Sequence, residues 1–300
     1  MNQPMIDILI PTYKPGPEFA MLLRRLACQR YPVHQVMIVN TEKEYWNSAF
    51  EKEYPGCRVI HIRREEFNHG GTRRRMAELS GADLFICMTQ DALPADENLV
   101  GNLAEAFKDP RVKAAYARQL PREDCSLLER CARLFNYPAE DRIKTREDLE
   151  TLGIKTFFCS DVCAAYDKKT YCELGGFPEK INFNEDMIYA SKVIQAGYAV
   201  AYVSRARVIH SHNYSGRQQF HRNFDLAVSQ EEHPEVFAGY PSEGEGIRLV
   251  KATAKYVCRK GKPWLLFPLF WQSVCKYAGY RLGKRHKRLT GAEGKRPMKK

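Results

Sequence analysis

Short apolar segments alternate with segments of helical periodicity over the first 118 residues, and this alternation constrains the fold more than any other feature of the chain. The apolar segments predict strands at 6–10, 36–39, 59–62 and 84–88. The segments between and after them predict helices at 18–29, 72–79 and 98–107. Strands that alternate with helices in this way indicate β–α–β units, so we expect an α/β fold with a mainly parallel central sheet.

The second half of the chain is less regular. Its patterns predict helices at 126–136 and 185–195, an extended segment at 157–166, a strand at 199–203 and a further extended segment at 207–212. No internal repeat or low-complexity linker precedes the C-terminal residues. We therefore expect the chain to stay globular through this half.

The charge of the chain is concentrated at one end. The 300 residues carry a formal charge of +11, but residues 251–300 hold 15 of the 47 basic residues and only one of the 36 acidic residues, Glu293. Residues 1–250 therefore hold 32 basic and 35 acidic residues, a balance of −3. Because a body of nearly balanced charge lacks the basic groove of a nucleic-acid-binding domain, we expect no nucleic-acid partner.

Several features of other protein classes are missing. The N-terminus lacks the basic and apolar regions of a secretory signal peptide, and no apolar stretch approaches the roughly 18–20 residues that span a bilayer. The ten cysteines include no Cys-x-x-Cys pair, which argues against a zinc site. We expect a cytoplasmic protein with reduced thiols.

Ligands of an open parallel sheet bind where the strands end, which selects the loops at 11–14, 40–43, 67–73 and 89–94. In the third loop, Gly70 and Gly71 precede a run of arginines that begins at Arg73. Glycines let the backbone approach a ligand, and a helix N-terminus offers N–H groups to an anion such as a diphosphate. An ordinary glycine-rich turn before an exposed basic helix face is the alternative.

Carboxylates and histidines at three further places are candidates for metal binding, phosphate binding or general-base catalysis. Asp91 follows the strand predicted at 84–88, where a carboxylate can hold a hard divalent cation or simply cap a turn. Asp186 stands at the start of the helix predicted at 185–195, where it could act as a general base or only favour the helix dipole. His210 and His212 share one face of an extended segment and could bind a metal or a phosphate, or be surface histidines.

Taken in order, these segments resemble family 2 glycosyltransferases of the GT-A fold over about residues 5–230. Residues 8–13 are similar to the opening strand of that family, and residues 80–92 resemble its approach to an Asp-x-Asp motif. The Gly-Gly-Phe sequence at 175–177, followed by Asn-Glu-Asp at 184–186, resembles its acceptor-side motif. Within the family, the sequences at 69–73, 89–92 and 210–215 look most like those of bacterial rhamnosyltransferases.

The resemblance implies a role for each matching residue. It implies that the general base is Asp186, with Asn184 and Glu185 beside it on the acceptor side. It implies that Mg²⁺ or Mn²⁺ is held by Asp91 and His210, with His212 as the alternative to His210. The residues that it implies for donor binding are Pro11, Thr12, Tyr13, Asn40, Glu42, His69, Gly70, Gly71, Arg73, Gln90 and Asp91.

Two positions depart from the family pattern. Thr89 replaces the first aspartate of the Asp-x-Asp motif, which loosens the expected metal site. Residues 40–42 stand where the family has an acidic pair that contacts the base, and they leave only Glu42 as a candidate acid.

The resemblance implies an inverting transfer of a sugar, L-rhamnose from dTDP-rhamnose, to a hydroxyl of a cell-surface polysaccharide or a polyprenyl-linked precursor. Asp186 would accept the proton of the acceptor hydroxyl, and the cation, Arg73 and the helix-end N–H groups would stabilise the leaving diphosphate. A UDP-hexose donor is one alternative. A catalytically silent domain that only binds nucleotide sugars or membranes is another.

The C-terminal residues have a separate character. We expect a GT-A domain over 1–245, with a donor half at 1–118 and an acceptor half at 119–245, followed by a helical, basic and amphipathic extension over 246–300. Tryptophans and phenylalanines at 262–271 and cations at 284–288 suit a helix at an anionic membrane surface, so we expect peripheral attachment to the inner face of the cell membrane. Packing of these aromatic residues on the catalytic domain and an RNA-binding tail are the alternatives.

Overall fold

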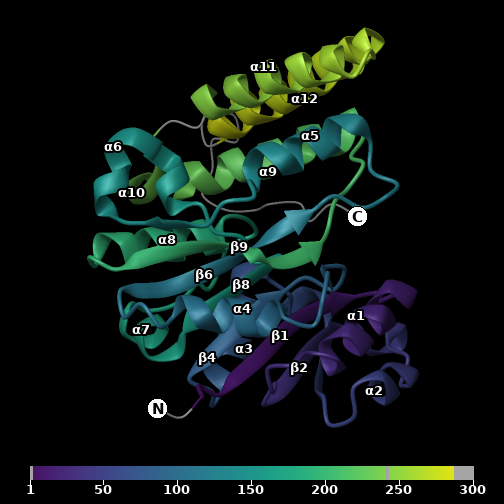
Figure 1. Ribbon diagram of the computed structural model, residues 1–300, viewed down its shortest axis with the longest axis vertical. Helices are drawn as coiled ribbons and strands as arrows, with labels where there is room; N and C mark the ends of the chain where they lie inside the picture. Colours follow the sequence, from purple (N-terminus) through teal and green to yellow (C-terminus); the bar gives the residue numbers. More distant parts are fainter. Residues whose placement is uncertain (1–2, 241–242, 287–300) are drawn as a thin grey trace. The chain divides into compact units, whose positions relative to one another are not determined.

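The computed structural model describes residues 3–240 and 243–286, and the chain divides into two compact units, 1–212 and 213–300 (Figure 1). This division falls before the predicted boundary between 245 and 246, because α9 (Gly216–Glu232) packs along α12 (Leu266–Lys284) within the second unit. The predicted donor and acceptor halves stay predictions. The last basic residues of the chain, 287–300, lie outside the described residues.

A nine-stranded sheet forms the centre of the first unit within the part of the chain that the structure describes, with the strand order β3-β2-β1-β4-β8-β6-β9-β5 and with β7 paired to β9. The strands are β1 (Ile6–Tyr13), β2 (Gln35–Thr41), β3 (Arg58–Ile62), β4 (Leu84–Met88), β5 (Leu93–Pro94), β6 (Val112–Leu120), β7 (Arg142–Lys144), β8 (Cys163–Asp167) and β9 (Ala199–Ile209). The helices of this unit are α1 (Pro17–Ala27), α2 (Ala49–Glu53), α3 (His69–Leu79), α4 (Leu99–Ala106), α5 (Leu127–Asn136), α6 (Leu149–Leu152), α7 (Lys168–Glu173) and α8 (Glu185–Gln195).

The sheet is α/β as expected, but its strand directions are mixed. Strands β3, β2, β1 and β4 are parallel, as the alternation of strands and helices predicted. Strand β8 runs antiparallel to both β4 and β6, and β5 and β7 run antiparallel to β9. Strands β6 and β9 again pair in parallel, so the expected parallel pairing is present in both halves of the sheet. The antiparallel β8 lies between these halves because it enters the sheet from an irregular segment and not from a crossover helix.

The two faces of the sheet bury different side chains. On one face, Ile6, Ile8 and Ile10 of β1 pack in an aliphatic core with residues of α1 and α4. On the other face, the ring of Phe85 stacks on Tyr166 at 5.3 Å and meets Tyr171 of α7 at 4.9 Å. Alternate side chains of the strands thus hold α1 and α4 on one face and α7 on the other (Figure 1).

Three predicted elements differ from those in the structure. Helix α3 begins at His69 and not at 72, because the Asn68 side chain caps it by accepting a hydrogen bond of 3.0 Å from the Gly71 N–H. The segment 157–166 is not continuously extended, since a 3₁₀ helix (Gly153–Phe157) and a loop precede β8. The strands expected at 199–203 and 207–212 are one strand, β9, which ends at Ile209.

The second unit consists of helices, namely α9, α10 (Pro234–Phe237), α11 (Glu243–Arg259) and α12, with a short 3₁₀ turn (Pro263–Leu265) before α12. Gly279 and Gly283 bring α12 against α9, because a methyl group at either position would overlap the carbonyl oxygen of Phe220 or Phe224. Tyr280 is buried between them and donates a hydrogen bond of 3.3 Å to Gln230. Among the described helices, none combines the length and the apolar character that a crossing of the bilayer requires.

Candidate active site

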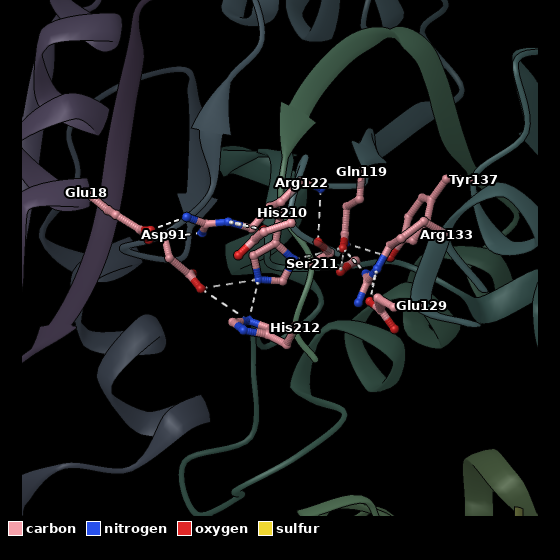
Figure 2. A network of polar contacts seen from close by, with 12 residues as sticks. Glu18, Asp91, Gln119, Arg122, Glu129, Arg133, Tyr137, His210, Ser211 and His212 are labelled. Atoms are coloured by element: carbon pink, nitrogen blue, oxygen red, sulfur yellow. Dashed lines mark hydrogen bonds and ion pairs between the residues drawn. The ribbon is translucent and has the colours of Figure 1, made fainter. Parts of the chain in front are cut away.

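The short pairing of β5 with β9 brings two distant loops together. Leu93 lies opposite Ile209 in this pairing, so the loop after β4 meets the residues that follow β9. Figure 2 shows Asp91 facing His210 and His212 there. The Oδ2 atom of Asp91 lies 3.6 Å from His210 Nε2 and 3.2 Å from His212 Nε2, and the two Nε2 atoms lie 3.0 Å apart.

The orientation of His210 is set by Gln119, which is buried at the end of β6. The Oε1 atom of Gln119 accepts a hydrogen bond from Arg133, and His210 Nδ1 lies 3.1 Å from the same oxygen. Because Gln119 Oε1 can only accept, Nδ1 carries the proton of the neutral imidazole. The lone pair of His210 Nε2 is therefore directed at Asp91 and His212 (Figure 2).

This cluster fits a divalent cation. One oxygen ligand and two nitrogen ligands converge within 4.8 Å of one another, a donor set suited to Mn²⁺ and related transition metals. Burial by itself would raise the pKa of Asp91, but the hydrogen bond from His212 and the charges of both histidines lower it below its ordinary value. The carboxylate is therefore ionised and able to bind a metal, and His212 offers a further nitrogen beside it.

A second cluster surrounds Asp186, at the start of α8. The backbone N–H of Asp161 donates to Asp186 Oδ2 at 3.1 Å, and the N–H of Met187 donates to Oδ1 at 2.7 Å. Asp186 is partly exposed, whereas the neighbouring Glu185 is buried. The Asp186 carboxylate is thus held at two points, and the residue keeps part of its surface exposed to an acceptor.

Three carboxylates share this second cluster with one cation, Arg73 of α3. The Arg73 guanidinium lies 3.0 Å from Glu185 and 3.4 Å from Asp161, and the hydroxyl of Tyr166 donates to Asp161 at 2.6 Å. Burial raises the pKa of Asp186 well above its ordinary value, and the negative charges of Asp161 and Glu185 raise it further. A raised pKa makes the ionised Asp186 a stronger base.

One loop connects the two clusters. Gln119, which orients His210, also donates to the Ser160 hydroxyl at 3.0 Å. Ser160 precedes Asp161, whose backbone binds Asp186. Hydrogen bonds through Gln119, Ser160 and Asp161 therefore connect the candidate metal ligands with the candidate base. We expect a change in the loop between Phe157 and Cys163 to alter the geometry of both clusters.

The ends of β1 and β2 hold the residues predicted to bind the nucleoside. The Thr12 hydroxyl donates to Asn40 Oδ1 at 3.1 Å, and the Asn40 amide donates to the Glu42 carbonyl at 3.0 Å. The Gln90 side chain bridges to the backbone of Tyr13, accepting from its N–H at 2.9 Å and donating to its carbonyl at 3.1 Å. These contacts tie the end of β1 to β2 on one side and to the loop of Asp91 on the other.

The glycines predicted to cradle a diphosphate are placed differently. The Gly70 N–H donates to the Ile181 carbonyl at 3.0 Å, and the Gly71 N–H is taken by Asn68. A methyl group at Gly70 would overlap Ile181 and the Pro178 carbonyl, and one at Gly71 would overlap the Glu179 carbonyl. The two glycines admit the segment 178–181, and both N–H groups are engaged within the protein, while the diphosphate contact of this loop stays a prediction.

Arg73 is buried, whereas His69 lies at the surface. Arg73 is 4% exposed and paired with two carboxylates, so its guanidinium is committed within the protein. His69 is exposed in the first turn of α3, where its ring meets that of Phe67 at 5.0 Å. Pro11 is partly exposed on β1, and Asn184 is buried at the N-terminal end of α8 with a left-handed backbone.

Sequence reasoning missed Gln119, Arg133, Asp161 and Tyr166. A signal for Asp161 was present, because a charged residue within the apolar stretch 157–166 must be paired if it is buried. For Gln119 and Arg133 no such signal exists, since both are ordinary polar residues: Gln119 contacts His210, which lies far away in the sequence, and Arg133 donates to Gln119.

Comparison with known proteins identifies related sequences. The model of the family described as glycosyl transferase family 2 matches residues 7–175. The O-antigen chain rhamnosyltransferase RfbN of Salmonella typhimurium is 37% identical over 283 residues, which is 93% of this chain and 89% of RfbN. The O-antigen chain rhamnosyltransferase WbaN of Salmonella anatum is 36% identical over 286 residues, or 94% of this chain and 90% of WbaN.

Solved structures share the fold at low sequence identity. The mannosyltransferase PcManGT of Pyrobaculum calidifontis, solved with GDP-Man and Mn²⁺, superposes with a TM-score of 0.63 at 14% identity, covering 98% of this chain and 89% of its own. TarS 1-349 of S. aureus superposes with a TM-score of 0.52 at 13% identity, covering 96% of this chain and 92% of its own.

Proposed function

The chain belongs to glycosyl transferase family 2 and is a glycosyltransferase, and we propose that it transfers L-rhamnose from dTDP-rhamnose to a hydroxyl of an O-antigen or related polysaccharide chain. The observation that carries the proposal is the 36–37% identity, over most of the chain, to two O-antigen chain rhamnosyltransferases. The acceptor in this proposal is a growing chain linked to a polyprenyl lipid.

We propose that the Asp91–His210–His212 cluster holds the divalent cation. Mn²⁺ suits its one-oxygen, two-nitrogen donor set better than Mg²⁺, which prefers oxygen ligands. A cation bound there would neutralise the charge that develops on the leaving diphosphate. The role of the protein is to keep Asp91 ionised and to hold His210 in the tautomer that directs Nε2 inward.

In the proposed reaction, Asp186 Oδ1 or Oδ2 accepts the proton of the acceptor hydroxyl as its oxygen attacks the anomeric carbon. The C–O bond to the diphosphate breaks on the opposite face of the sugar, so the anomeric configuration inverts without a covalent intermediate. A positioned base contributes about 10²–10⁴-fold to such a step. The hydrogen bonds from the N–H groups of Asp161 and Met187 keep the carboxylate fixed during the transfer.

The nucleoside of the donor would lie at the ends of β1 and β2, beside Pro11, Thr12, Asn40 and Glu42. Tyr13 is 40% exposed there, and its ring meets that of Tyr45 at 5.6 Å. An exposed aromatic pair next to polar backbone and amide groups suits a pyrimidine base. Gln90 would place this end of the donor in register with the cation, because it ties Tyr13 to the loop of Asp91.

We also propose that α12 attaches the protein to the inner face of the cell membrane, where a polyprenyl-linked acceptor is found. The exposed side chains of this region include Trp264, Phe267, Phe270, Trp271 and Tyr277, with exposed fractions from 57% to 77%. Five exposed aromatic residues in a stretch rich in cations are typical of an interfacial helix. Helix α9 packs on α12 at Gly279 and Gly283, and Trp271 lies close to Gly216 at the start of α9. Among the described residues, the other four aromatic side chains stay exposed.

A transfer assay tests the reaction. Purified full-length protein is incubated with Mn²⁺, radiolabelled dTDP-rhamnose and the glycolipid fraction extracted from bacterial membranes, and label in that fraction is counted. We expect wild-type protein to label the glycolipid and Asp186→Asn protein to label it at least a hundredfold more slowly. If the glycolipid is labelled from UDP-glucose or UDP-galactose and not from dTDP-rhamnose, the donor is a UDP-hexose.

A further inference from the structure

Arg73 lies among carboxylates, away from the diphosphate contact that its sequence motif suggested. We propose that Arg73 is a positioning residue for the general base, holding Asp161 and Glu185 in place on either side of Asp186, and that it makes no contact with the donor. This inference rests on the proposed function, because it takes Asp186 to be the base.

Burial supports this assignment. Arg73 is 4% exposed, Asp161 3% and Glu185 6%, so the three side chains meet in the interior of the first unit. The guanidinium uses Nη1 for Glu185 at 3.0 Å and for the His69 carbonyl at 3.4 Å, and Nε faces Asp161 at 3.4 Å. A guanidinium engaged on two sides and removed from solvent is not presented to a ligand that binds from outside.

The backbone explains how Arg73 can act on Asp186. Glu185 precedes Asp186 in the chain, and the N–H of Asp161 donates to Asp186 Oδ2 at 3.1 Å. Arg73 binds the side chains of both of these residues. One cation therefore fixes the start of α8 and the loop before β8, which are the two segments that hold the Asp186 carboxylate.

Arg73 also acts on Asp186 through its charge. Titratable and charged groups that interact with the base come from several neighbouring elements, namely Arg73 on α3, Tyr137 after α5, Cys159 and Asp161 in the loop before β8, Tyr166 on β8 and Glu185 on α8, while Cys87 on β4 faces Asp161 and Glu185. Arg73 is the one cation in that set, against the two carboxylates Asp161 and Glu185. Buried like charges disfavour ionisation, so removal of Arg73 would leave Asp186 harder to ionise.

This action through charge predicts opposite effects of two substitutions. Arg73→Met removes the cation, so it raises the pKa of the base and shifts the acid limb of the pH–rate profile to higher pH by about one unit. Asp161→Asn removes a negative charge but keeps the backbone N–H that binds Asp186, so it shifts the same limb to lower pH. A residue that merely supports the fold would move neither limb, because lost packing lowers the rate equally at every pH.

The experiment measures kcat/KM for rhamnose transfer to membrane-extracted glycolipid between pH 5.5 and 9, and the affinity for dTDP with Mn²⁺ by calorimetry. Wild type, Arg73→Met, Arg73→Lys and Asp161→Asn are compared, with Arg75→Met as the control for loss of an exposed arginine on the same helix. We expect Arg73→Met to be about tenfold slower than wild type at pH 6 and nearly equal at pH 9, with dTDP affinity within twofold. Arg73→Lys, which keeps the charge, should restore most of the rate at pH 6.

Two results would overturn the inference. If Arg73→Met weakens dTDP binding tenfold or more with an unshifted profile, Arg73 contacts the donor. If Asp161→Asn leaves the acid limb of the pH–rate profile at its wild-type pH, the charge of this cluster does not act on the base. The Asp161→Asn measurement gives this answer even if Arg73→Met fails to fold. Failure of the proposed function has a different signature, since wild-type protein would then not transfer rhamnose or Asp186→Asn would retain its activity.

Discussion

The Nε2 atoms of His210 and His212 lie 3.0 Å apart, and both face the Oδ2 atom of Asp91. Two imidazole nitrogens at this distance repel each other unless a proton or a cation lies between them. Position 89 is a threonine in this chain, and His212 offers a nitrogen beside Asp91. The arrangement predicts that both histidines contribute to metal binding.

The first prediction concerns the two histidines and the metal. His210→Ala and His212→Ala each remove one ligand, so we expect each to weaken Mn²⁺ binding at least tenfold, with a comparable loss of dTDP affinity in the presence of Mn²⁺. Calorimetric titration with MnCl₂ checks this, and His221→Ala in the second unit is the control. Unchanged Mn²⁺ binding in His212→Ala would remove that residue from the site.

The second prediction concerns Gln119, which contacts His210 and lies outside the ligand set. Gln119→Leu removes the oxygen that fixes the tautomer of His210 and leaves Arg133 without this acceptor. Partners of this kind contribute about 10–100-fold to metal affinity, so we expect a loss in that range by the same titration. Wild-type Mn²⁺ affinity in this variant would show that His210 is oriented by other contacts.

The third prediction concerns the glycines of α3. Gly70→Ala would drive a methyl group into Ile181 and the Pro178 carbonyl, and overpacking of this kind costs about 1–3 kcal/mol. We expect a lower melting temperature for Gly70→Ala and Gly71→Ala than for Gly81→Ala, where a methyl group meets open space. If the glycines serve a diphosphate instead, Gly70→Ala would keep its stability and lose only dTDP affinity.

The fourth prediction concerns Lys144, which is 3% exposed and donates to the carbonyls of Lys155 and Phe158. Burial lowers the pKa of Lys144 to about 7, compared with 10.5 in the unfolded chain. Between these values the unfolded state binds the extra proton, so this group makes the protein more stable as the pH rises from 7 towards 10.5. Below pH 7 both states are protonated, and the cost of the buried charge is fully present.

The free energy of unfolding, measured with urea at pH 6.5 and pH 9, tests this effect. The wild type should gain stability relative to Lys144→Met over this range, with a slope of at most about 1.4 kcal/mol per pH unit for one proton. Comparison with the variant removes the contributions of the carboxylates, which are common to both proteins. Parallel pH dependence of the two proteins would mean that Lys144 titrates near its ordinary value.

The fifth prediction concerns membrane attachment through α12. The triple variant Trp264→Ser, Phe267→Ser and Phe270→Ser lacks three aromatic side chains that are exposed and lie outside the core. We expect this triple variant to lose most of its flotation with vesicles that contain anionic lipid, while wild type floats and is released by high salt. The matched control is the triple variant Leu79→Ser, Leu134→Ser and Ile143→Ser, which replaces three exposed apolar residues of the first unit. Equal flotation of the two triple variants would contradict attachment through this helix.

Local patterns in the sequence were sufficient for part of this account. Strands with clear apolar runs, such as β1 and β4, and helices with a capping residue, such as α5 after Ser126, could be predicted because their signals lie within a few residues. Asp91 could be selected because it follows a predicted strand, and His210 and His212 because they share one face of a predicted extended segment. Their convergence depends on the pairing of β5 with β9, which joins segments more than one hundred residues apart and has no local signal.

The role of Arg73 could not be predicted for the same reason. Its neighbours in the sequence, two glycines and two further arginines, are typical of an anion site. Its actual partners, Asp161 and Glu185, come from segments that approach α3 only in the folded chain. The carbonyl of Ile181 likewise takes the Gly70 N–H that would otherwise be open to a phosphate.

Donor binding to the purified full-length protein tests the central claim most directly. The dissociation constants of dTDP-rhamnose, UDP-glucose, UDP-galactose and GDP-mannose are measured by calorimetry with and without Mn²⁺, for wild type and for Asp91→Asn. We expect that dTDP-rhamnose binds most tightly, that removal of Mn²⁺ weakens its binding at least tenfold, and that Asp91→Asn abolishes this metal dependence. Tighter binding of another donor, or equal binding of dTDP-rhamnose with and without Mn²⁺ in wild type, would contradict this expectation.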